Sequence, residues 1–303
     1  MHVGFIGLGN MGNPMCRNLL AAGFPLAVTD VRPEAAANLL ELGAAWLDSP
    51  AEVGATADVL ITMLPGPPQV EAVMLGQRGA FDAMRSGSTW IDMSTSTPAV
   101  ARRVLERAAA RGVSVLEAPV SGMARGAIGG TLQIFVGGDR QTFERCLPVL
   151  EAMGDPRRIF HIGPNGAGYA VKLLINLLWF MHAVATSEVM VLGRKAGVDL
   201  EVLHRSLVAS PANSHFLQED LLSVFEGDYD EAFSLALVCK DLGLAVDLAR
   251  DLGVPVELSA LVEQTYRRAR AQYGDRGGEM LAVKLLEDLT DMPLRRPSTV
   301  RPA

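Results

Sequence analysis

Lys172 and Asn176 stand four residues apart in a long apolar stretch with helical spacing, residues 169–196. Residues at this spacing share one face of a helix, so the two polar side chains are expected to lie together among apolar neighbours. Removal from water lowers the pKa of a lysine from about 10.4 toward the range useful for proton transfer. The pair therefore indicates general acid–base chemistry. Taken alone, however, the pair is more typical of a lysine whose long side chain extends to the surface from the first turn of a helix.

A second candidate lies in Glu117-Ala118-Pro119-Val120-Ser121-Gly122, at the carboxyl end of a predicted strand. In an open α/β sheet, ligands bind beyond these strand ends. A serine hydroxyl followed by glycine N–H groups can bind a carboxylate. Taken alone, the segment fits an ordinary turn equally well.

The segment Gly7-Leu8-Gly9-Asn10-Met11-Gly12 joins an apolar run, residues 3–6, to a helix predicted to begin near Asn13. The first glycine permits a tight turn, the second lets backbone N–H groups approach a pyrophosphate, and the third lets helix and strand pack closely. The positive end of the helix dipole also favours phosphates. The segment predicts a dinucleotide-binding loop.

Two charged residues then decide between NAD and NADP. Asp30 ends the next predicted strand, residues 26–29, where its carboxylate can accept hydrogen bonds from ribose hydroxyls and would repel a 2′-phosphate. Arg32 lies in the loop before Pro33 and could instead pair with that phosphate. Because the strand end fixes Asp30 more firmly, NAD is the predicted preference and NADP the alternative.

The predicted secondary structure that positions these residues changes near residue 163. Before it, short apolar runs alternate with helical patterns, which predicts an N-terminal Rossmann domain with a doubly wound, mostly parallel sheet over residues 1–163. After it, helical patterns dominate, which predicts an all-α domain over residues 164–294, joined by a long interdomain helix. Residues 295–303 are predicted to be a disordered tail. The expected strands are 3–6, 26–29, 59–63, 89–92, 114–117, 132–136 and 157–161.

Composition narrows the class of protein. The chain has 303 residues and a net charge of −7, which argues against a broad nucleic-acid partner. Cys16, Cys146 and Cys239 form no CxxC and the histidines no HExxH, so no metal site is predicted, and a reducing cytoplasm fits. No secretory signal is evident. The apolar stretch after Lys172 carries several polar residues, so it predicts a long buried helix and no membrane partner.

Together these motifs resemble the β-hydroxyacid dehydrogenase family, which includes 3-hydroxyisobutyrate dehydrogenase and tartronate semialdehyde reductase and is related to 6-phosphogluconate dehydrogenase. The resemblance covers about residues 1–290, with the motifs in the family's order. The matching segments are Gly7-Leu8-Gly9-Asn10-Met11-Gly12-Asn13-Pro14-Met15, Glu117 to Gly122 with Gly130-Thr131-Leu132 and Val136-Gly137-Gly138, Gly166 to Lys172 with Asn176, and Lys240-Asp241-Leu242-Gly243-Leu244-Ala245.

The resemblance implies a role for each candidate residue. Lys172 would be the general acid or base, and Asn176 would orient it and contact the substrate. Ser121 and Gly122 would bind the substrate carboxylate. The remaining implied positions are Leu64, Pro65 and Thr95, which would line the cofactor, and Lys240, which would approach cofactor and substrate from the second domain.

Four residues depart from the family pattern: Glu117 replaces a usual aspartate, Met123 a usual glycine, Gln133 a usual threonine, and Ile175 a frequent asparagine. Met123 supports an alternative, a reductase of imines or other carbonyls that has no carboxylate grip. Another alternative is a non-catalytic NAD-binding module. Lys172 opposes both.

The predicted function is therefore an NAD(P)-dependent oxidoreductase. It would transfer a hydride between nicotinamide and a small β-hydroxy acid or semialdehyde acid. Because the helical half is too apolar to be buried alone, a homodimer or homotetramer is expected.

Overall fold

The structure is a computed structural model that describes residues 1–229 and 233–296. It divides into two compact units, Met1–Leu173 and Leu174–Ala303. This division falls inside the long helix α8 (Ala167–Lys195), ten residues after the boundary expected from composition.

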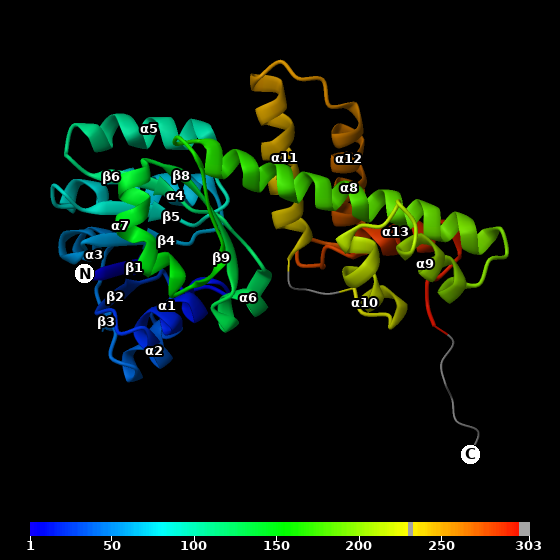
Figure 1. Ribbon diagram of the computed structural model, residues 1–303, viewed down its shortest axis with the longest axis horizontal. Coiled ribbons are helices and arrows are strands. Elements are labelled where there is room, and N and C mark those ends of the chain that lie inside the picture. Colours follow the sequence, from blue (N-terminus) through cyan, green and yellow to red (C-terminus); the bar gives the residue numbers. More distant parts are fainter. Residues whose placement is uncertain (230–232, 297–303) are drawn as a thin grey trace. The chain divides into compact units, whose positions relative to one another are not determined.

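The first unit is built on a mostly parallel sheet (Figure 1). Its parallel part has the order β3-β2-β1-β4-β5-β6, so the strand order reverses direction between β1 and β4, where ligands bind in doubly wound sheets. Beyond β6, the strand β8 runs antiparallel and pairs with both β7 and β9. The strands are β1 (Val3–Ile6), β2 (Leu26–Thr29), β3 (Ala45–Trp46), β4 (Val59–Thr62), β5 (Thr89–Asp92), β6 (Ser114–Glu117), β7 (Val120–Ser121), β8 (Leu132–Gly138) and β9 (Gly154–Gly163).

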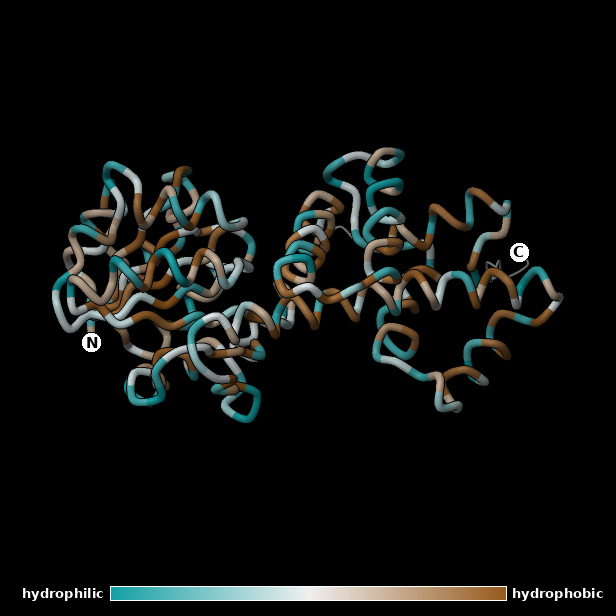
Figure 2. The backbone as a smooth tube through the Cα atoms, turned by 90° about the horizontal axis from the view of Figure 1, so that it is seen from above, coloured by the Kyte–Doolittle hydropathy of each residue, from teal (hydrophilic) through white to brown (hydrophobic). Residues whose placement is uncertain are grey.

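Helices cover both faces of this sheet and make two separate apolar cores. One core joins the sheet to α1, α2, α6 and α7, and the other joins it to α3, α4 and α5. In Figure 2, hydrophobic residues run through the central strands and polar residues follow the surrounding loops. The helices are α1 (Gly12–Ala21), α2 (Ala37–Glu41), α3 (Pro50–Thr56), α4 (Pro67–Leu75), α5 (Pro98–Ala109), α6 (Met123–Gly129) and α7 (Arg140–Glu151), with 3-10 turns at Pro33–Ala36 and Phe81–Ala83.

The second unit has helices and no strand within residues 174–229 and 233–296. The α/β class with a helical C-terminal part is therefore confirmed. Apolar residues of α8, among them Phe180, pack against α11, α12 and α13. The elements after α8 are α9 (Leu200–Val208), a π-helical turn at Phe216–Asp220, α10 (Leu222–Phe225), α11 (Leu235–Asp251), α12 (Glu257–Tyr273) and α13 (Leu281–Thr290).

The prediction that α8 is a buried helix is wrong in part. By length and composition alone α8 could cross a membrane, and 33% of its most apolar window is buried. Leu174, Leu178 and Leu192 are exposed, because the other helices of the second unit pack against only part of the α8 surface.

The predicted C-terminal tail begins inside ordered structure. Leu294 is fully buried, and Arg296 pairs with Glu201 and Glu226. The rest of that predicted tail, residues 297–303, lies outside the described residues.

Candidate cofactor and substrate site

The three motif glycines lie between β1 and α1 and have three different surroundings. Gly7 has φ +102°, and a Cβ built on it would lie 2.3 Å from the carbonyl oxygen of Met63. A Cβ on Gly12 would lie 1.8 Å from the carbonyl oxygen of Gly7. Around Gly9 nothing lies within 4 Å. Gly7 and Gly12 are therefore required by the fold, whereas Gly9 keeps open the space that a pyrophosphate needs, so this loop fits a dinucleotide.

Gly9→Val is expected to leave the fold intact and to weaken NADH binding at least about tenfold, because the new side chain enters this open space. Gly12→Ala is the contrasting variant, since its Cβ must displace backbone and should cost on the order of 2 kcal/mol of stability. Thermal unfolding and NADH fluorescence titration separate the two effects. Undiminished NADH binding by Gly9→Val would place the phosphates elsewhere.

Asp30 is fixed beside this loop. Its Oδ2 accepts a hydrogen bond from the Leu8 N–H at 2.6 Å, and its Oδ1 accepts one from the Arg32 N–H at 2.9 Å. The side chain of Asp30 is 9% exposed, whereas that of Arg32 is 61% exposed. The carboxylate is thus held at the end of β2, while the more exposed Arg32 guanidinium lies beside it, with its Nε 3.8 Å from Asp30 Oδ1.

Leu64, Pro65 and Thr95 follow β4 and β5. These two strands are parallel to β1, so their carboxyl ends lie at the same edge of the sheet as the glycine loop. The Leu64 N–H donates to Ser94 Oγ at 2.9 Å, which ties the two loops together. The structure thus brings these residues to the edge where the sequence places the cofactor.

A buried network around Asp92 was not foreseen from the sequence. Asp92 Oδ1 accepts hydrogen bonds from Thr62 Oγ1 and Ser94 Oγ, both at 2.6 Å, and Oδ2 accepts one from the Tyr169 hydroxyl. Burial raises the pKa of Asp92, although these hydrogen bonds act in the opposite direction. The network joins two strand ends to the first turn of α8. The signal in the sequence that could have indicated this network was an aspartate at the end of the apolar strand β5.

Glu117, at the end of β6, is the cross-strand neighbour of Asp92. Both of its carboxylate oxygens accept a hydrogen bond from the Gly166 N–H, at 2.6 and 2.7 Å. Burial raises the pKa of Glu117 to about 7, and the hydrogen bond from Gly166 is the largest opposing effect. This carboxyl group therefore holds the chain just before α8.

Close packing fixes the same turn from the other side. A Cβ on Gly168 would lie 2.7 Å from the carbonyl oxygen of Phe135 on β8. Lys172 follows Gly168 by four residues and so shares its helix face. The base of α8, and with it Lys172, is held against β6 and β8.

In the second unit, Asn176 is bound to a buried acid. Its Nδ2 donates to Asp241 Oδ2 at 2.7 Å, and Lys240 Nζ lies 2.7 Å from Asp241 Oδ1. The Asp241 side chain is 1% exposed, so its charge is balanced by Lys240. Asp241 thus positions both predicted residues, a role that the sequence did not reveal.

The segment after β7 has an unusual backbone. Gly122 has φ +124°, and Met123 has φ +55°, a left-handed conformation that costs a side-chain-bearing residue about 1 kcal/mol. Met123 is 45% exposed. The glycine that the family pattern has at this position would adopt the conformation without this cost.

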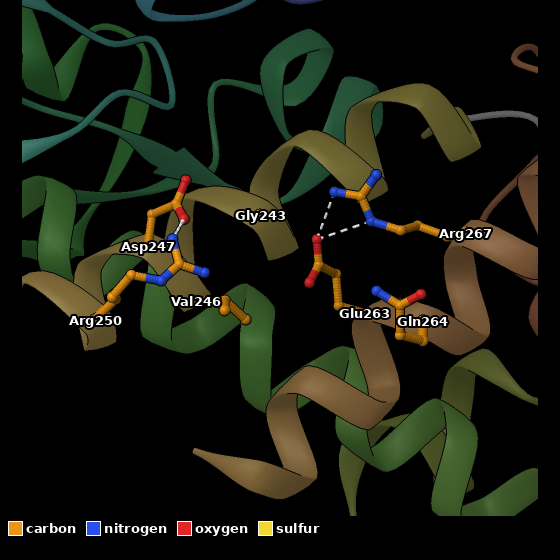
Figure 3. A pocket seen from close by; sticks show the side chains of 7 residues that line it. All are labelled: Gly243, Val246, Asp247, Arg250, Glu263, Gln264 and Arg267. Atoms are coloured by element: carbon orange, nitrogen blue, oxygen red, sulfur yellow. Dashed lines mark hydrogen bonds and ion pairs between the residues drawn. The ribbon is translucent and has the colours of Figure 1, made fainter. Parts of the chain in front are cut away.

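A groove of about 440 Å³ lies between α11 and α12, and none of these residues lines it (Figure 3). Arg267 donates to Glu263 within α12, and Arg250 pairs with Asp247 within α11, so each wall carries its own ion pair. Its charges therefore neutralise one another. The remaining lining residues are Gly243, Val246 and Gln264.

Comparison with known proteins covers nearly the whole chain. Residues 2–163 match the NAD binding domain of 6-phosphogluconate dehydrogenase, and residues 166–286 match the NAD-binding domain of NADP-dependent 3-hydroxyisobutyrate dehydrogenase.

Individual relatives agree with these matches. The chain is 39% identical to 3-hydroxyisobutyrate dehydrogenase of Pseudomonas aeruginosa, over 87% of this chain and 90% of the relative. It is 34% identical to 2-(hydroxymethyl)glutarate dehydrogenase of Eubacterium barkeri, over 95% of both chains. The solved 3-hydroxyisobutyrate dehydrogenase of Mycobacterium tuberculosis, with L-serine, has a TM-score of 0.86 at 33% identity and covers 94% of this chain and 99% of its own.

Proposed function

The chain belongs to the β-hydroxyacid dehydrogenase family, and from this premise we propose that Lys172 is its general acid–base and that Ser121 and Gly122 bind the substrate carboxylate. The enzyme class, an NAD(P)-dependent oxidoreductase of small hydroxy acids and semialdehydes, follows from the family. One observation carries the role of Lys172. Asp92 and Glu117 hold the base of its helix at the strand ends where the cofactor loop also lies.

The chain's residues would then act in a definite order. Ser121 and the neighbouring backbone N–H groups bind the carboxylate and orient the hydroxyl carbon. A nicotinamide dinucleotide held by the Gly7–Gly12 loop and Asp30 would supply the hydride chemistry. During oxidation, the neutral Lys172 amine takes the hydroxyl proton, and during reduction it returns that proton to the carbonyl oxygen. Asn176, anchored by Asp241, lies one helical turn away and orients the amine.

Binding of the substrate carboxylate by Ser121 and Gly122 is tested with matched neutral substrates. A β-hydroxy acid is expected to react at least about tenfold faster, by kcat/KM, than its amide or methyl ester, because charge-assisted hydrogen bonds are lost in the neutral compounds. The assay uses a panel of hydroxy acids and semialdehydes with both cofactors. Equal rates for acid and amide would favour the reductase of imines or other carbonyls.

For the cofactor we propose a preference for NAD. A 2′-phosphate beside the fixed Asp30 carboxylate would be repelled, so NADH should bind at least about tenfold more tightly than NADPH. Asp30→Ser should narrow this ratio, and Arg32→Gln should leave NADH affinity unchanged. Tighter NADPH binding by the wild type would mean that Arg32 governs the choice.

We also propose that the chain forms a homodimer or homotetramer. The exposed leucines of α8 in the second unit, Leu174, Leu178 and Leu192, support this, because a second copy would remove them from water. Light scattering of the purified protein gives the number of copies, and a monomeric mass would contradict the proposal.

A further inference from the structure

A polar row crosses three strands next to Ser121. Ser121 on β7 lies directly opposite Gln133 on β8 in an antiparallel pair, so their side chains share one face of the sheet. On the next strand, β9, Arg158 Nη2 donates a hydrogen bond to Gln133 Oε1 at 3.1 Å. Ser121, Gln133 and Arg158 therefore form a continuous row, which we call the β7–β9 row.

The β7–β9 row lies on the accessible side of these strands. Leu132 and Ile134, which flank Gln133 on β8, are fully buried, so Gln133 points to the opposite face. Phe135 and Phe160 stack on each other one step further along β8 and β9, with ring centroids 6.3 Å apart. The row thus borders an aromatic pair in which Phe160 is exposed and Phe135 is buried.

The chemistry of the row suits an anion. The Gln133 amide oxygen is occupied by Arg158, which leaves its NH₂ group to donate outward. Arg158 makes no other hydrogen bond or ion pair within residues 1–229 and 233–296. The nearby Asp155 forms an ion pair with Arg157, with 3.2 Å between Asp155 Oδ2 and Arg157 Nη2. The hydrogen bond from Arg157 is the main cause that lowers the pKa of Asp155, and the charge of Arg158 lowers it further. The row therefore presents hydroxyl, amide and guanidinium donors with one positive charge.

From this geometry we propose that Gln133 and Arg158 bind a second anionic group of the substrate. The enzyme would then act on hydroxy acids with an acidic group at each end. This inference rests on the proposed function, in which Ser121 and Gly122 bind the first carboxylate. Neighbouring strands lie about 4.8 Å apart, and Gln133 and Arg158 lie one and two strands away from Ser121, so the second group would lie about 5 to 10 Å from the first. A carboxylate, sulfonate or phosphonate shares the required chemistry.

Binding of unreactive acids to the enzyme–NADH complex tests the proposal without turnover. Glutarate carries two carboxylates and butyrate one on a similar chain. We expect glutarate to bind about ten- to a hundredfold more tightly, because it gains charge-assisted hydrogen bonds. Arg158→Gln should remove most of this preference and Gln133→Thr part of it. Arg157→Gln is the matched control, since this neighbouring arginine points to Asp155.

Kinetics provide the second measurement. With 2-(hydroxymethyl)glutarate and 3-hydroxyisobutyrate as substrates, Arg158→Gln should raise KM for the first at least about tenfold and leave kcat and KM for the second unchanged. The affinities of glutarate, 4-sulfobutyrate and 4-phosphonobutyrate identify which second anionic group is preferred. The proposal is supported if any of these three acids binds more tightly than butyrate.

Equal affinity of butyrate and all three diacids in the wild type would overturn the proposal, as would an equal loss in Arg157→Gln. A failure of the proposed function has a different signature. In that case no hydroxy acid turns over, while the glutarate preference and its dependence on Arg158 persist.

Discussion

Lys172→Ala is expected to lower turnover by roughly a hundred- to ten-thousand-fold, the usual contribution of a positioned general acid–base. The amine that accepts the hydroxyl proton is lost, while the glycine loop and Asp30 are untouched. NADH affinity should therefore stay within about twofold of the wild type. Steady-state kinetics and NADH titration of the same preparation give both quantities.

A matched variant controls for the loss of a lysine from α8. Lys195 ends this helix at an exposed position, so Lys195→Ala should retain full turnover. Near wild-type turnover by Lys172→Ala would refute the assignment. Loss of NADH binding together with turnover would indicate a structural role for Lys172.

Glu117→Gln is expected to change how stability depends on pH. The folded chain holds the Glu117 proton up to about pH 7, whereas the ordinary value is 4.5. An unfolded chain releases that proton at lower pH, so the stabilisation is complete below about pH 4.5 and is lost as pH rises through 7. The shift corresponds to on the order of 3 kcal/mol. Because a glutamine side chain does not titrate, the free energy of unfolding of Glu117→Gln should lack this part of the decrease with rising pH.

Urea unfolding of both proteins between pH 5 and 8.5 measures the difference. Glu144→Gln, at an exposed position on α7, removes a negative charge without touching the site and should follow the wild type. Parallel curves for Glu117→Gln and wild type would show that the carboxyl group of Glu117 titrates as it does in water. The expected divergence would locate a buried acid at the base of α8.

Strong local patterns were predictable. β1, β2, β5 and β6 have the bounds predicted from the sequence, because a strand buried on both faces needs a continuous apolar stretch at its centre. The short elements β3, β7 and α6 escaped prediction. A strand of two residues has no periodicity to detect, and α6 begins at Met123, whose left-handed backbone no propensity predicts.

The glycine loop, the helix segment with Lys172 and the family motifs were predictable from sequence alone, because each motif depends on residues close together in the chain. Only the tertiary structure placed Tyr169 on Asp92, Gly166 on Glu117, and Asn176 on Asp241. The partners in these pairs are separated by 77, 49 and 65 residues. Such contacts, and the burial that shifts the pKa of Asp92 and Glu117, arise from packing of the whole chain, which local spacing does not encode.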